Sequence, residues 1–469
     1  MISSDTALNT FEALTALSPL DGRYNSQLVN LAHLFSEEHL ISTRLFIEVK
    51  YLLFLSKTGC IPGFSHDVRE QLMRISSDFS REDAEHVKAL EAQTHHDAKA
   101  VEYFLREKMN DKKLPGGEFI HLALTSEDVN SIAYSLMISQ GKAELGKTLR
   151  SVLKLLAEMA EHHAVVPMMA RTHGQEAVPT TVGKEIAVFA TRLLGELQRF
   201  DALPIEAKLT GAVGNFNAHQ VAFPDKYWPQ LSQEFITSLG LEPNLMTTQI
   251  LPTESYSALF ANLVQINGIL LDLNQDIWRY VSDHWFGQRV EKSQVGSSTM
   301  PQKVNPIDFE NSEGNLGLAN ALLMFFIQKL PVSRLQRDLS DSTVKRSIGS
   351  AFGYCQLAYS SLLKGLPKLT VNQQKISADL GDHWEVLAEA IQVILRLEGD
   401  DDGYEKLRLL TQGKQLTESE VHAFIESLDV SEEIKKRLSA LRPETYLGIA
   451  PELTDQAVQR INRYLKGVS

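Results

Sequence analysis

Hydrophobic residues in the middle of the chain recur at the spacing of one face of an α-helix. Between residues 255 and 286, which include one glycine and no proline, the apolar stripe advances by four, three, four, three and four residues: Leu259, Leu263, Ile266, Leu270, Leu273 and Ile277. This spacing keeps the side chains on one side of a helix. At 1.5 Å per residue, the predicted helix is about 48 Å long.

Three further segments show the same helical pattern. One carries apolar residues at Leu145, Leu149, Val152, Leu156 and Met159, and starts at residues 125–128, where Thr-Ser-Glu-Asp fits a capping box closed by aspartate. Residues 179–200 and 308–330 predict two more helices. All four exceed the ~11 residues of an average helix, so the pattern predicts an elongated helical bundle.

The segments on either side of the bundle predict shorter helices. Residues 36–59 and 80–110 precede it, and residues 372–466 follow it, with breaks at Gly399, Gly413 and Pro443. We find no alternation of strands and helices, no glycine-rich dinucleotide loop and no P-loop. The predicted fold is therefore all-α, with an N-terminal helical domain (1–120), a central long-helix bundle (121–365) and a C-terminal helical domain (366–469).

The long helix at residues 255–286 also carries apolar residues away from its main stripe: Val264, Ile269, Leu271 and Trp278. A helix that is apolar on more than one side needs more than one neighbour. The pattern therefore predicts oligomerisation through the bundle, and a large monomeric bundle is the alternative.

Composition narrows the class of protein. Apolar residues make up 43% and charged residues 22% of the 469 positions, which is typical of soluble globular proteins. A net charge of −13 argues against nucleic acid or an anionic membrane as the main partner. A few arginines and lysines can still form a local positive pocket for a small anionic substrate.

The chain shows no feature of export or membrane insertion. Its N-terminal residues lack a basic stretch followed by an apolar run, and the longest uncharged central stretch, residues 314–328, is shorter than the ~20 residues of a membrane span. Cys60 and Cys355 lack the spacing of metal ligands and are interpreted as two free thiols. We expect a cytoplasmic protein.

One loop, residues 295–306, combines several groups suited to binding an anion. Its sequence, Val-Gly-Ser-Ser-Thr-Met-Pro-Gln-Lys-Val-Asn-Pro, places two serine hydroxyls, a lysine cation and an asparagine amide within nine residues. Such groups can bind a carboxylate and stabilise additional negative charge on it. The composition alone would equally fit a polar loop between helices.

The order of residues in this loop resembles the signature of the fumarase/aspartase superfamily, Gly-Ser-Ser-x-Met-Pro-x-Lys-x-Asn. The resemblance implies a mainly helical homotetramer of three-domain subunits. It also implies release of fumarate by β-elimination, in active sites that are each built from three subunits.

Other segments resemble the adenylosuccinate lyases within that superfamily: residues 18–24 (Ser-Pro-Leu-Asp-Gly-Arg-Tyr), 171–175 (Arg-Thr-His-Gly-Gln), 337–346 (Arg-Asp-Leu-Ser-Asp-Ser-Thr-Val-Lys-Arg), 94–97 and 125–128. Fumarases and argininosuccinate lyases usually have leucine after the histidine of the second segment, where this chain has Gly174. One departure is Gln302, where many adenylosuccinate lyases have histidine and argininosuccinate lyases often have glutamine. The resemblance extends from residue 18 to the end of the bundle and continues more weakly beyond.

The resemblance implies a role for each matched residue. His173 is matched to the general acid and Ser297 to the general base, which needs positive surroundings from Lys303 and the loop amides. The other matched positions are substrate contacts, several of them to phosphate and ribose: Arg23, Tyr24, His95, His96, Asp97, Thr125, Ser126, Gln249, Ser298, Lys303, Val304, Asn305, Asn311, Arg337, Ser342, Thr343, Val344, Lys345 and Arg346.

Neighbouring polar groups have simpler interpretations. His95 and His96, if adjacent on one helix, would point about 100° apart and would rarely share a metal ion. Glu91 and Glu127 are interpreted as solvated helix faces. The resemblance implies neither a metal nor a cofactor.

The implied activity is cleavage of adenylosuccinate to AMP and fumarate, and of the succinylated carboxamide ribotide SAICAR to AICAR, in purine nucleotide biosynthesis. One alternative is argininosuccinate lyase, which has no need of the phosphate set Arg23, Arg337, Ser342 and Arg346. Another is a structural protein that has kept the fold without activity, which the presence of His173, Ser297, Lys303 and Asn305 together disfavours. Because the matched segments lie at opposite ends of long helices, we expect sites shared between subunits.

Overall fold

Helices of very different lengths dominate the structure, a computed structural model that describes residues 13–289, 300, 303–400 and 402–468. In this part of the chain, the strands form three two-stranded sheets, two antiparallel and one parallel. The all-α prediction is confirmed, with these short sheets as additions.

The helices and strands have the following bounds. The helices are α1 (Val29–Phe35), α2 (Glu37–Lys57), α3 (His66–Ser77), α4 (Arg81–Thr94), α5 (Asp97–Asp111), α6 (Ser126–His162), α7 (Val182–Ala202), α8 (Asn217–Ala222), α9 (Trp228–Ser238), α10 (Glu254–Ser282), α11 (Ile307–Lys329), α12 (Ser340–Lys345), α13 (Ile348–Gly365), α14 (Gln373–Gly381), α15 (Ala388–Leu397), α16 (Gly403–Thr411), α17 (Glu418–Ser427), α18 (Glu432–Ser439) and α19 (Ala450–Val468). The strands are β1 (Pro167–Thr172), β2 (Gln175–Thr181), β3 (Glu206–Ala207), β4 (Glu242–Pro243), β5 (Phe286–Gln288) and β6 (Leu369–Val371).

The four predicted long helices are present as α6, α7, α10 and α11, with two differences at their ends. Residues 179–181 belong to β2 instead of the following helix, because they pair with β1. The helix predicted to reach residue 286 stops at Ser282, and His284 takes a left-handed conformation (φ 60°) that an α-helix cannot continue through.

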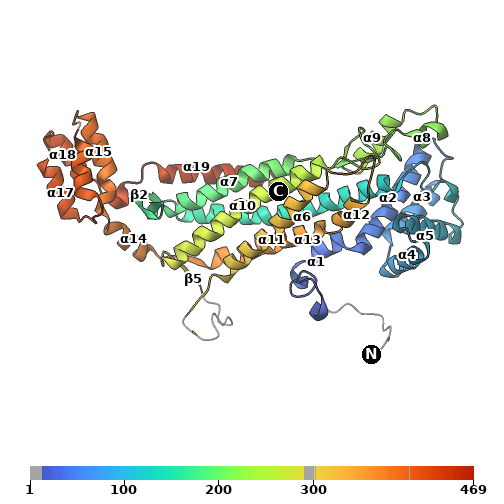
Figure 1. Cartoon of the computed structure of the whole chain (residues 1–469), viewed down its shortest axis with the longest axis horizontal. Helices are drawn as coiled ribbons and strands as arrows, with labels where there is room; N and C mark the ends of the chain where they lie inside the picture. The colour runs from blue at the N-terminus through green and yellow to red at the C-terminus, as the bar shows by residue number, and fades with distance from the viewer. Residues whose placement is uncertain (1–12, 290–299, 301–302, 401, 469) are drawn as a thin grey trace. The chain divides into compact units, whose positions relative to one another are not determined.

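The chain falls into two compact units. The first contains residues 1–147, 198–267 and 315–357, and the second contains residues 148–197, 268–314 and 358–469. The boundaries fall inside the long helices α6, α7, α10, α11 and α13. Figure 1 shows α2 to α5 gathered within the first unit, and α15, α17 and α18 gathered within the second. The division into three domains remains a prediction.

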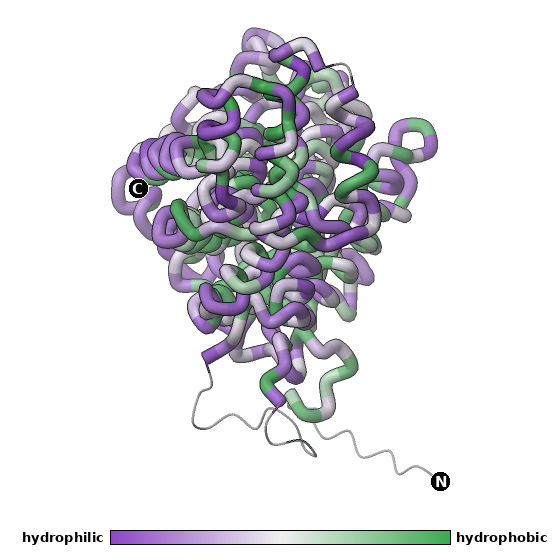
Figure 2. Tube along the Cα trace, turned by 90° about the vertical axis from the view of Figure 1, so that its left-hand side faces the viewer, coloured by the Kyte–Doolittle hydropathy of each residue, from purple (hydrophilic) through white to green (hydrophobic). Residues whose placement is uncertain are grey.

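The core of the first unit is built by α10, α11 and α13. Phe260 of α10 packs against Phe326 of α11 and Phe352 of α13, with ring centroids 5.8 and 6.2 Å apart. Asn267, fully buried about two turns further along α10, donates to Asn320 Oδ1 at 2.8 Å. Figure 2 shows hydrophilic and hydrophobic positions alternating along the helices. The apolar stripes produced by this alternation pack against one another in the core.

The apolar composition of α10 is explained by this packing. It is the one helix of the described residues that is long and apolar enough, by length and composition, to cross a membrane. More than half (56%) of its most apolar window is buried within the protein. The six residues of the predicted stripe, from Leu259 to Ile277, are all buried. We therefore assign α10 to the protein core.

A buried ion pair holds the start of α6. Asp128 and Lys208 lie 2.9 Å apart with both side chains fully buried. Asp128 also accepts hydrogen bonds from the amides of Thr125, Thr210 and Gly211 at 2.9 to 3.2 Å. The first of these is the backbone contact expected of the predicted capping box. The pair therefore ties the first turn of α6 to the segment before α8.

In the second unit, polar contacts join the long helices α7, α10 and α11. Asn274 of α10 donates to Ser312 of α11 at 3.0 Å, and Arg192 of α7 pairs with Asp272 of α10 at 2.6 Å. The short C-terminal helices occur as predicted. Gly399 and Gly413 have positive φ at two of the breaks, and Pro443 begins a single 3-10 turn at the third.

We predict that Lys208→Met destabilises the protein strongly. The substitution leaves the Asp128 carboxylate buried without its counter-charge, a change that typically costs roughly 3–5 kcal/mol. The measurement is the urea midpoint by circular dichroism. Arg81→Met, which breaks the exposed Arg81–Glu85 pair, serves as control and should leave the midpoint unchanged. Equal midpoints for wild type and Lys208→Met would contradict this interpretation.

Candidate functional site

His173 occupies the tip of a tight β-hairpin in the second unit. Strands β1 and β2 are antiparallel, and Thr172 pairs with Gln175, so His173 and Gly174 form a two-residue turn. Both turn residues have positive φ, 55° and 75°, as in the turns that match the twist of a hairpin. Positive φ is uncommon for residues other than glycine, although histidine adopts it more readily than most, and it costs on the order of 1–3 kcal/mol. Such conformations are found preferentially at functional sites. The imidazole is exposed.

The sequence analysis did not predict this hairpin. A signal is present in retrospect, since a glycine that permits positive φ stands between two short runs containing β-branched residues, valine and threonine. The runs also contain Met168, Met169 and Pro179, which weaken the strand pattern. A two-stranded ribbon of this kind takes its stability from the packing around it, which a local pattern does not contain.

Several predicted substrate contacts come together in the first unit around Arg337. Its guanidinium donates through Nη1 to Gln249 Oε1 at 3.1 Å, and its Nη2 lies 3.0 Å from Glu127 Oε1. Gln249 and Arg337, 88 residues apart in sequence, are thus direct neighbours. The main-chain oxygen of Gln249 is in turn held by the buried Lys208 ammonium at 2.8 Å.

Glu127 is buried, and the prediction that it lies on a solvated helix face is wrong. Only 2% of the residue is exposed. Its carboxylate contacts Arg337, accepts a hydrogen bond from Asn130 at 2.8 Å, and lies 3.7 Å from Lys345 Nζ. The first turn of α6 faces these cations, which compensate the charge that burial would otherwise disfavour.

A second ion-pair cluster surrounds Asp97. Arg44 Nη2 and Arg346 Nη2 approach its Oδ2 at 2.8 and 3.2 Å, and Arg346 Nη1 also contacts Glu37 at 2.6 Å. Burial alone would raise the pKa of Asp97, but Arg44, the Ala98 amide and Arg346 outweigh it and hold that pKa below its ordinary value. Asp97 is therefore a fixed anion that orients both arginines.

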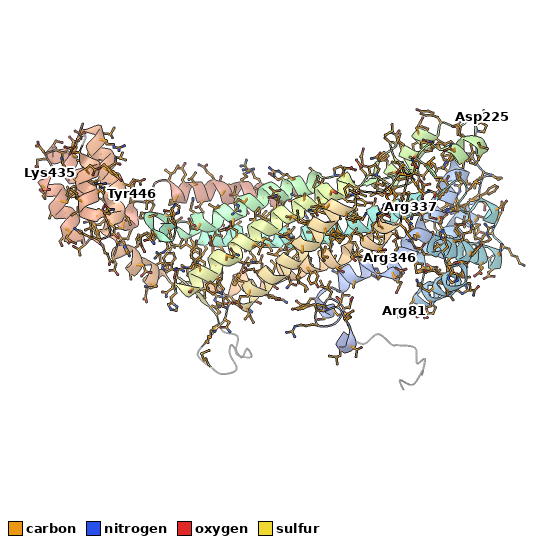
Figure 3. All side chains as sticks on the ribbon, viewed as in Figure 1. Arg81, Asp225, Arg337, Arg346, Lys435 and Tyr446 are labelled. Atoms are coloured by element: carbon orange, nitrogen blue, oxygen red, sulfur yellow. The ribbon has the colours of Figure 1, made fainter. Side chains whose placement is uncertain are left out.

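Arg44 and Asn130 join these two clusters. Arg44 donates from Nε to Asn130 Oδ1 at 2.9 Å, and Asn130 donates to Glu127. A continuous network thus runs from Arg337 to Arg346, the residues that flank α12 in Figure 3. The sequence analysis missed Arg44, Asn130 and Glu127. A charged residue inside an apolar stretch, such as Arg44 beside Leu40, Ile41 and Leu45, was the available signal.

The segment 340–346 forms α12 and its C-terminal cap. Ser342 and Val344 are half-buried, and Thr343 is exposed. Lys345 is buried and pairs with Asp341 at 2.6 Å, while its ammonium lies 5.9 Å from the centre of the Tyr134 ring. Lys345 therefore stabilises α12 and contributes positive charge beside Glu127.

Arg23 and Tyr24 lie in the N-terminal segment, with the Arg23 guanidinium 5.9 Å from the centre of the Tyr24 ring. The neighbouring residues Leu20 and Asp21 line a cavity of about 270 Å³ together with Arg346 and Gly349. This cavity brings the first and last of the matched segments within the first unit close together.

His95 and His96 lie at the junction of two helices. His95 caps the end of α4 with φ 51°, and His96 caps the start of α5, where its Nδ1 accepts a hydrogen bond from the Lys99 amide at 3.2 Å. The sequence analysis treated them as neighbours on one helix, which is wrong because the chain turns between them. Among the described residues, no three His, Cys, Asp or Glu side chains are grouped to hold a metal ion.

The remaining matched residues fall in two places. Ser126 begins α6 and Thr125 directly precedes it, and both are half-buried. Of the 295–306 loop, Ser297, Ser298 and Gln302 lie outside the described residues. Lys303 and Val304 are exposed, Asn305 is half-buried, and Asn311, in the first turn or so of α11, donates to Ser361 at 2.9 Å.

Two family models match the chain. One, described as "Lyase", covers residues 22–320, and the other, "Adenylosuccinate lyase C-terminal", covers residues 333–447. Adenylosuccinate lyase of Haemophilus influenzae is 46% identical over 451 residues, which are 94% of this chain and 98% of that one. The enzyme of Escherichia coli K12 is 44% identical over 452 residues, or 95% and 99% of the two chains.

The chain belongs to the adenylosuccinate lyase family. The two family models together with these relatives cover the N-terminal segment, the bundle and most of the C-terminal helices. Membership in the adenylosuccinate lyase family therefore extends through residues 372–447, where the sequence resemblance was weaker.

Solved structures support the fold of this adenylosuccinate lyase family member. A fumarate lyase from Mesorhizobium sp. BNC1 aligns with a TM-score of 0.74 at 20% identity, over 92% of this chain and 97% of that one. The 3-carboxy-cis,cis-muconate lactonizing enzyme from Pseudomonas putida aligns with a TM-score of 0.75 at 20% identity, over the same shares. At these identities the likeness establishes the shared helical fold alone.

We predict that His121 makes stability depend on pH near neutrality. Its Nδ1 lies 2.6 Å from Glu48 in a nearly buried site, with Glu102 at 3.7 Å from Nε2. Burial alone would lower the pKa of His121, but the two carboxylates outweigh it and raise that pKa above 6.5. Because the folded state binds the proton more tightly, this contribution is present below about pH 6.5 and is lost as the pH rises through the folded pKa.

The test compares wild type with His121→Gln, which cannot be protonated. Between pH 6 and 9, the melting temperature of the wild type should fall more steeply than that of the variant. Parallel curves over this range would show that the His121–Glu48 contact does not take up a proton on folding.

Proposed function

We propose that this protein is a carbon–nitrogen lyase that cleaves adenylosuccinate to AMP and fumarate, and SAICAR to AICAR and fumarate, in purine nucleotide biosynthesis. The observation that carries the proposal is 46% identity to an adenylosuccinate lyase over nearly the full length of both chains. The clustering of Gln249 with Arg337, and of Asp97 with Arg346, supports it.

The reaction divides between two proton-transfer groups. Ser297 is proposed to remove the proton from the carbon beside a carboxylate, whose oxygens take up the electrons as an aci-carboxylate. The C–N bond then breaks, and His173 protonates the departing nitrogen. Lys303 and Asn305 are proposed to bind the carboxylate and stabilise its extra charge. The exposed position of His173 at a turn supports its role, because the ring can reach a bound substrate.

The two arginine clusters favour a substrate that carries a phosphate. Arg337 and Arg346 present planar guanidinium groups suited to phosphate oxygens, with Ser342 and the N-terminal residues Arg23 and Tyr24 as further contacts. The carboxylates of Glu127 and Asp97 hold these guanidinium groups in place. Argininosuccinate has no phosphate, so this arrangement favours the purine substrates over that alternative.

We further propose a homotetramer with active sites completed by neighbouring subunits. Helix α6 has 37 residues, so its ends are about 55 Å apart, and the helix cannot bring them together. Ser126 begins this helix, and the hairpin of His173 follows its other end. The exposed apolar side chains Leu318, Met324 and Phe325 of α11 support association through the bundle. We place the enzyme in the cytoplasm, in keeping with its free thiols Cys60 and Cys355.

We predict fumarate release from adenylosuccinate and from SAICAR, and none from argininosuccinate. The reason is that the arginine clusters have a phosphate to bind only in the two purine substrates. The measurement is the absorbance change on cleavage, with fumarate quantified by coupled assay. Fumarate from argininosuccinate, with none from adenylosuccinate, would overturn the proposed function.

We predict that His173→Ala and Ser297→Ala each lower kcat by about 10²–10⁴-fold, because each removes a proton-transfer group. Mixed under conditions that exchange subunits, the two inactive variants should regain part of the wild-type activity, since some sites would receive both intact residues. Subunit exchange is confirmed by native mass spectrometry. Confirmed exchange without recovered activity would show that both residues of a site come from one subunit.

A further inference from the structure

Arg171, two residues before His173, bridges the two strands of the hairpin close to its tip. Its Nη1 contacts Glu176 Oε1 at 2.6 Å, and Glu176 is its direct partner in the register of β1 and β2. The same nitrogen donates to the carbonyl oxygen of Gly174 at 3.4 Å. The guanidinium thus closes the turn that contains His173 from one side.

The guanidinium also lies over the indole ring of Trp285, with Cζ 5.3 Å from the ring centre. A cation over the face of tryptophan is attracted by the negative charge of that face. Arg171 therefore makes three interactions at once, with the opposite strand, the turn and a neighbouring element. A planar guanidinium can do this, whereas a lysine ammonium cannot present the same flat surface.

Trp285 is held firmly enough to serve as a platform. It is 2% exposed, and its indole N–H donates to Asp379 of α14 at 2.7 Å. Its carbonyl oxygen accepts from the Asn372 amide at 2.8 Å, and its ring stacks on Tyr280 of α10 with an angle of 22° between the planes. These contacts anchor it to both α10 and α14.

The hairpin needs such an anchor near its tip. A two-stranded ribbon is marginal by itself, and the pairing of β1 with β2 is interrupted between Met169 and Arg171 by a bulge, which increases bending and twist. A cavity of about 260 Å³ lined by Arg171, Trp285, Lys375 and His383 leaves space beside the guanidinium. Charge and stacking, more than steric confinement, therefore keep Arg171 in position.

We propose that Arg171 is the positioning residue of the general acid: by joining the His173 turn to Trp285, it sets the location of the imidazole relative to the departing nitrogen. The inference rests on the proposed function, since it assumes that His173 protonates the leaving group. Small displacements of a catalytic group can cost about 10²-fold in rate. Loss of the anchor should therefore lower kcat and leave substrate affinity nearly unchanged.

The first test compares Arg171→Gln, Arg171→Lys and the matched control Arg192→Gln. In the control, Arg192 likewise lies over an aromatic ring, Phe189, at 5.5 Å and pairs with a carboxylate, Asp272, at 2.6 Å. It lies in the third turn of α7, which follows the end of β2 opposite the His173 turn. We expect Arg171→Gln to lower kcat 10- to 100-fold with KM within threefold, and Arg171→Lys to recover part of the loss. Arg192→Gln should keep kcat within twofold.

Two further readouts separate positioning from a general structural effect. In the His173→Ala background, Arg171→Gln should cause no additional loss, because the group that it positions is gone. In deuterated water, the Arg171→Gln variant should incorporate deuterium at the carbon beside the carboxylate faster, relative to product formation, than the wild type. If protonation of the nitrogen becomes slow while proton removal from carbon remains intact, the carbanion is returned to substrate more often. Each return in deuterated water can place deuterium on that carbon.

The outcomes are distinguishable. Equal losses from Arg171→Gln in the wild-type and His173→Ala backgrounds, or a loss confined to KM, would overturn the positioning role while leaving the lyase activity established. A wild-type enzyme that releases no fumarate from adenylosuccinate would overturn the proposed function and this inference with it. Circular dichroism and native mass of each variant verify that fold and assembly are retained, and Glu176→Gln provides a second, milder break of the same anchor.

Discussion

The buried pair of Asp128 and Lys208 organises the first unit around α6. Two opposite charges without solvent exposure are stable only when both are fully hydrogen-bonded, and here three amides and two carbonyl oxygens complete their shells. One of those carbonyls belongs to Gln249, whose side chain accepts from Arg337. An ion pair in the core therefore helps to position Arg337, a candidate phosphate ligand, through a single residue, Gln249.

The protein reconciles an acidic composition with its proposed site for an anionic substrate by pairing arginines with the buried carboxylate of Glu127 and the half-buried carboxylate of Asp97. The net charge of −13 would repel an anion at long range, yet Arg337, Arg346 and Arg44 are concentrated along one network. Glu127 and Asp97 hold the guanidinium groups in fixed orientations before any substrate arrives. Pre-oriented donors lose less conformational entropy on binding than free side chains do.

In the second unit, the candidate site depends on a strained turn instead of a network of buried charges. Its proposed acid, His173, stands on a turn with positive φ, on a ribbon that is interrupted by a bulge. Strain of this kind persists only where the surroundings determine the conformation. Arg171, Glu176 and the anchored Trp285 supply those surroundings. Side-chain contacts, more than backbone pairing, thus support the hairpin tip.

The sequence by itself determined the helical architecture, because the spacing of apolar residues such as Leu259, Leu263 and Ile266 specifies a helix without reference to anything distant. It also allowed a prediction of the chemistry of residues 295–306, 171–175 and 337–346, because each of these motifs is contiguous in the sequence. The exact helix ends could not be predicted from apolar spacing. α10 ends before His284, which has a left-handed backbone conformation, and residues 179–181 pair with β1 instead of extending α7.

Only the tertiary structure decided which distant residues meet. Glu127 looks like any surface glutamate in sequence, and it becomes a buried partner of Arg337 because a segment 210 residues away packs against the start of α6. Trp285 likewise becomes the platform for Arg171 through contacts with Tyr280, Asn372 and Asp379. Local patterns encode backbone conformation, whereas burial, charge pairing and the placement of a strained turn arise from long-range packing that no local pattern contains.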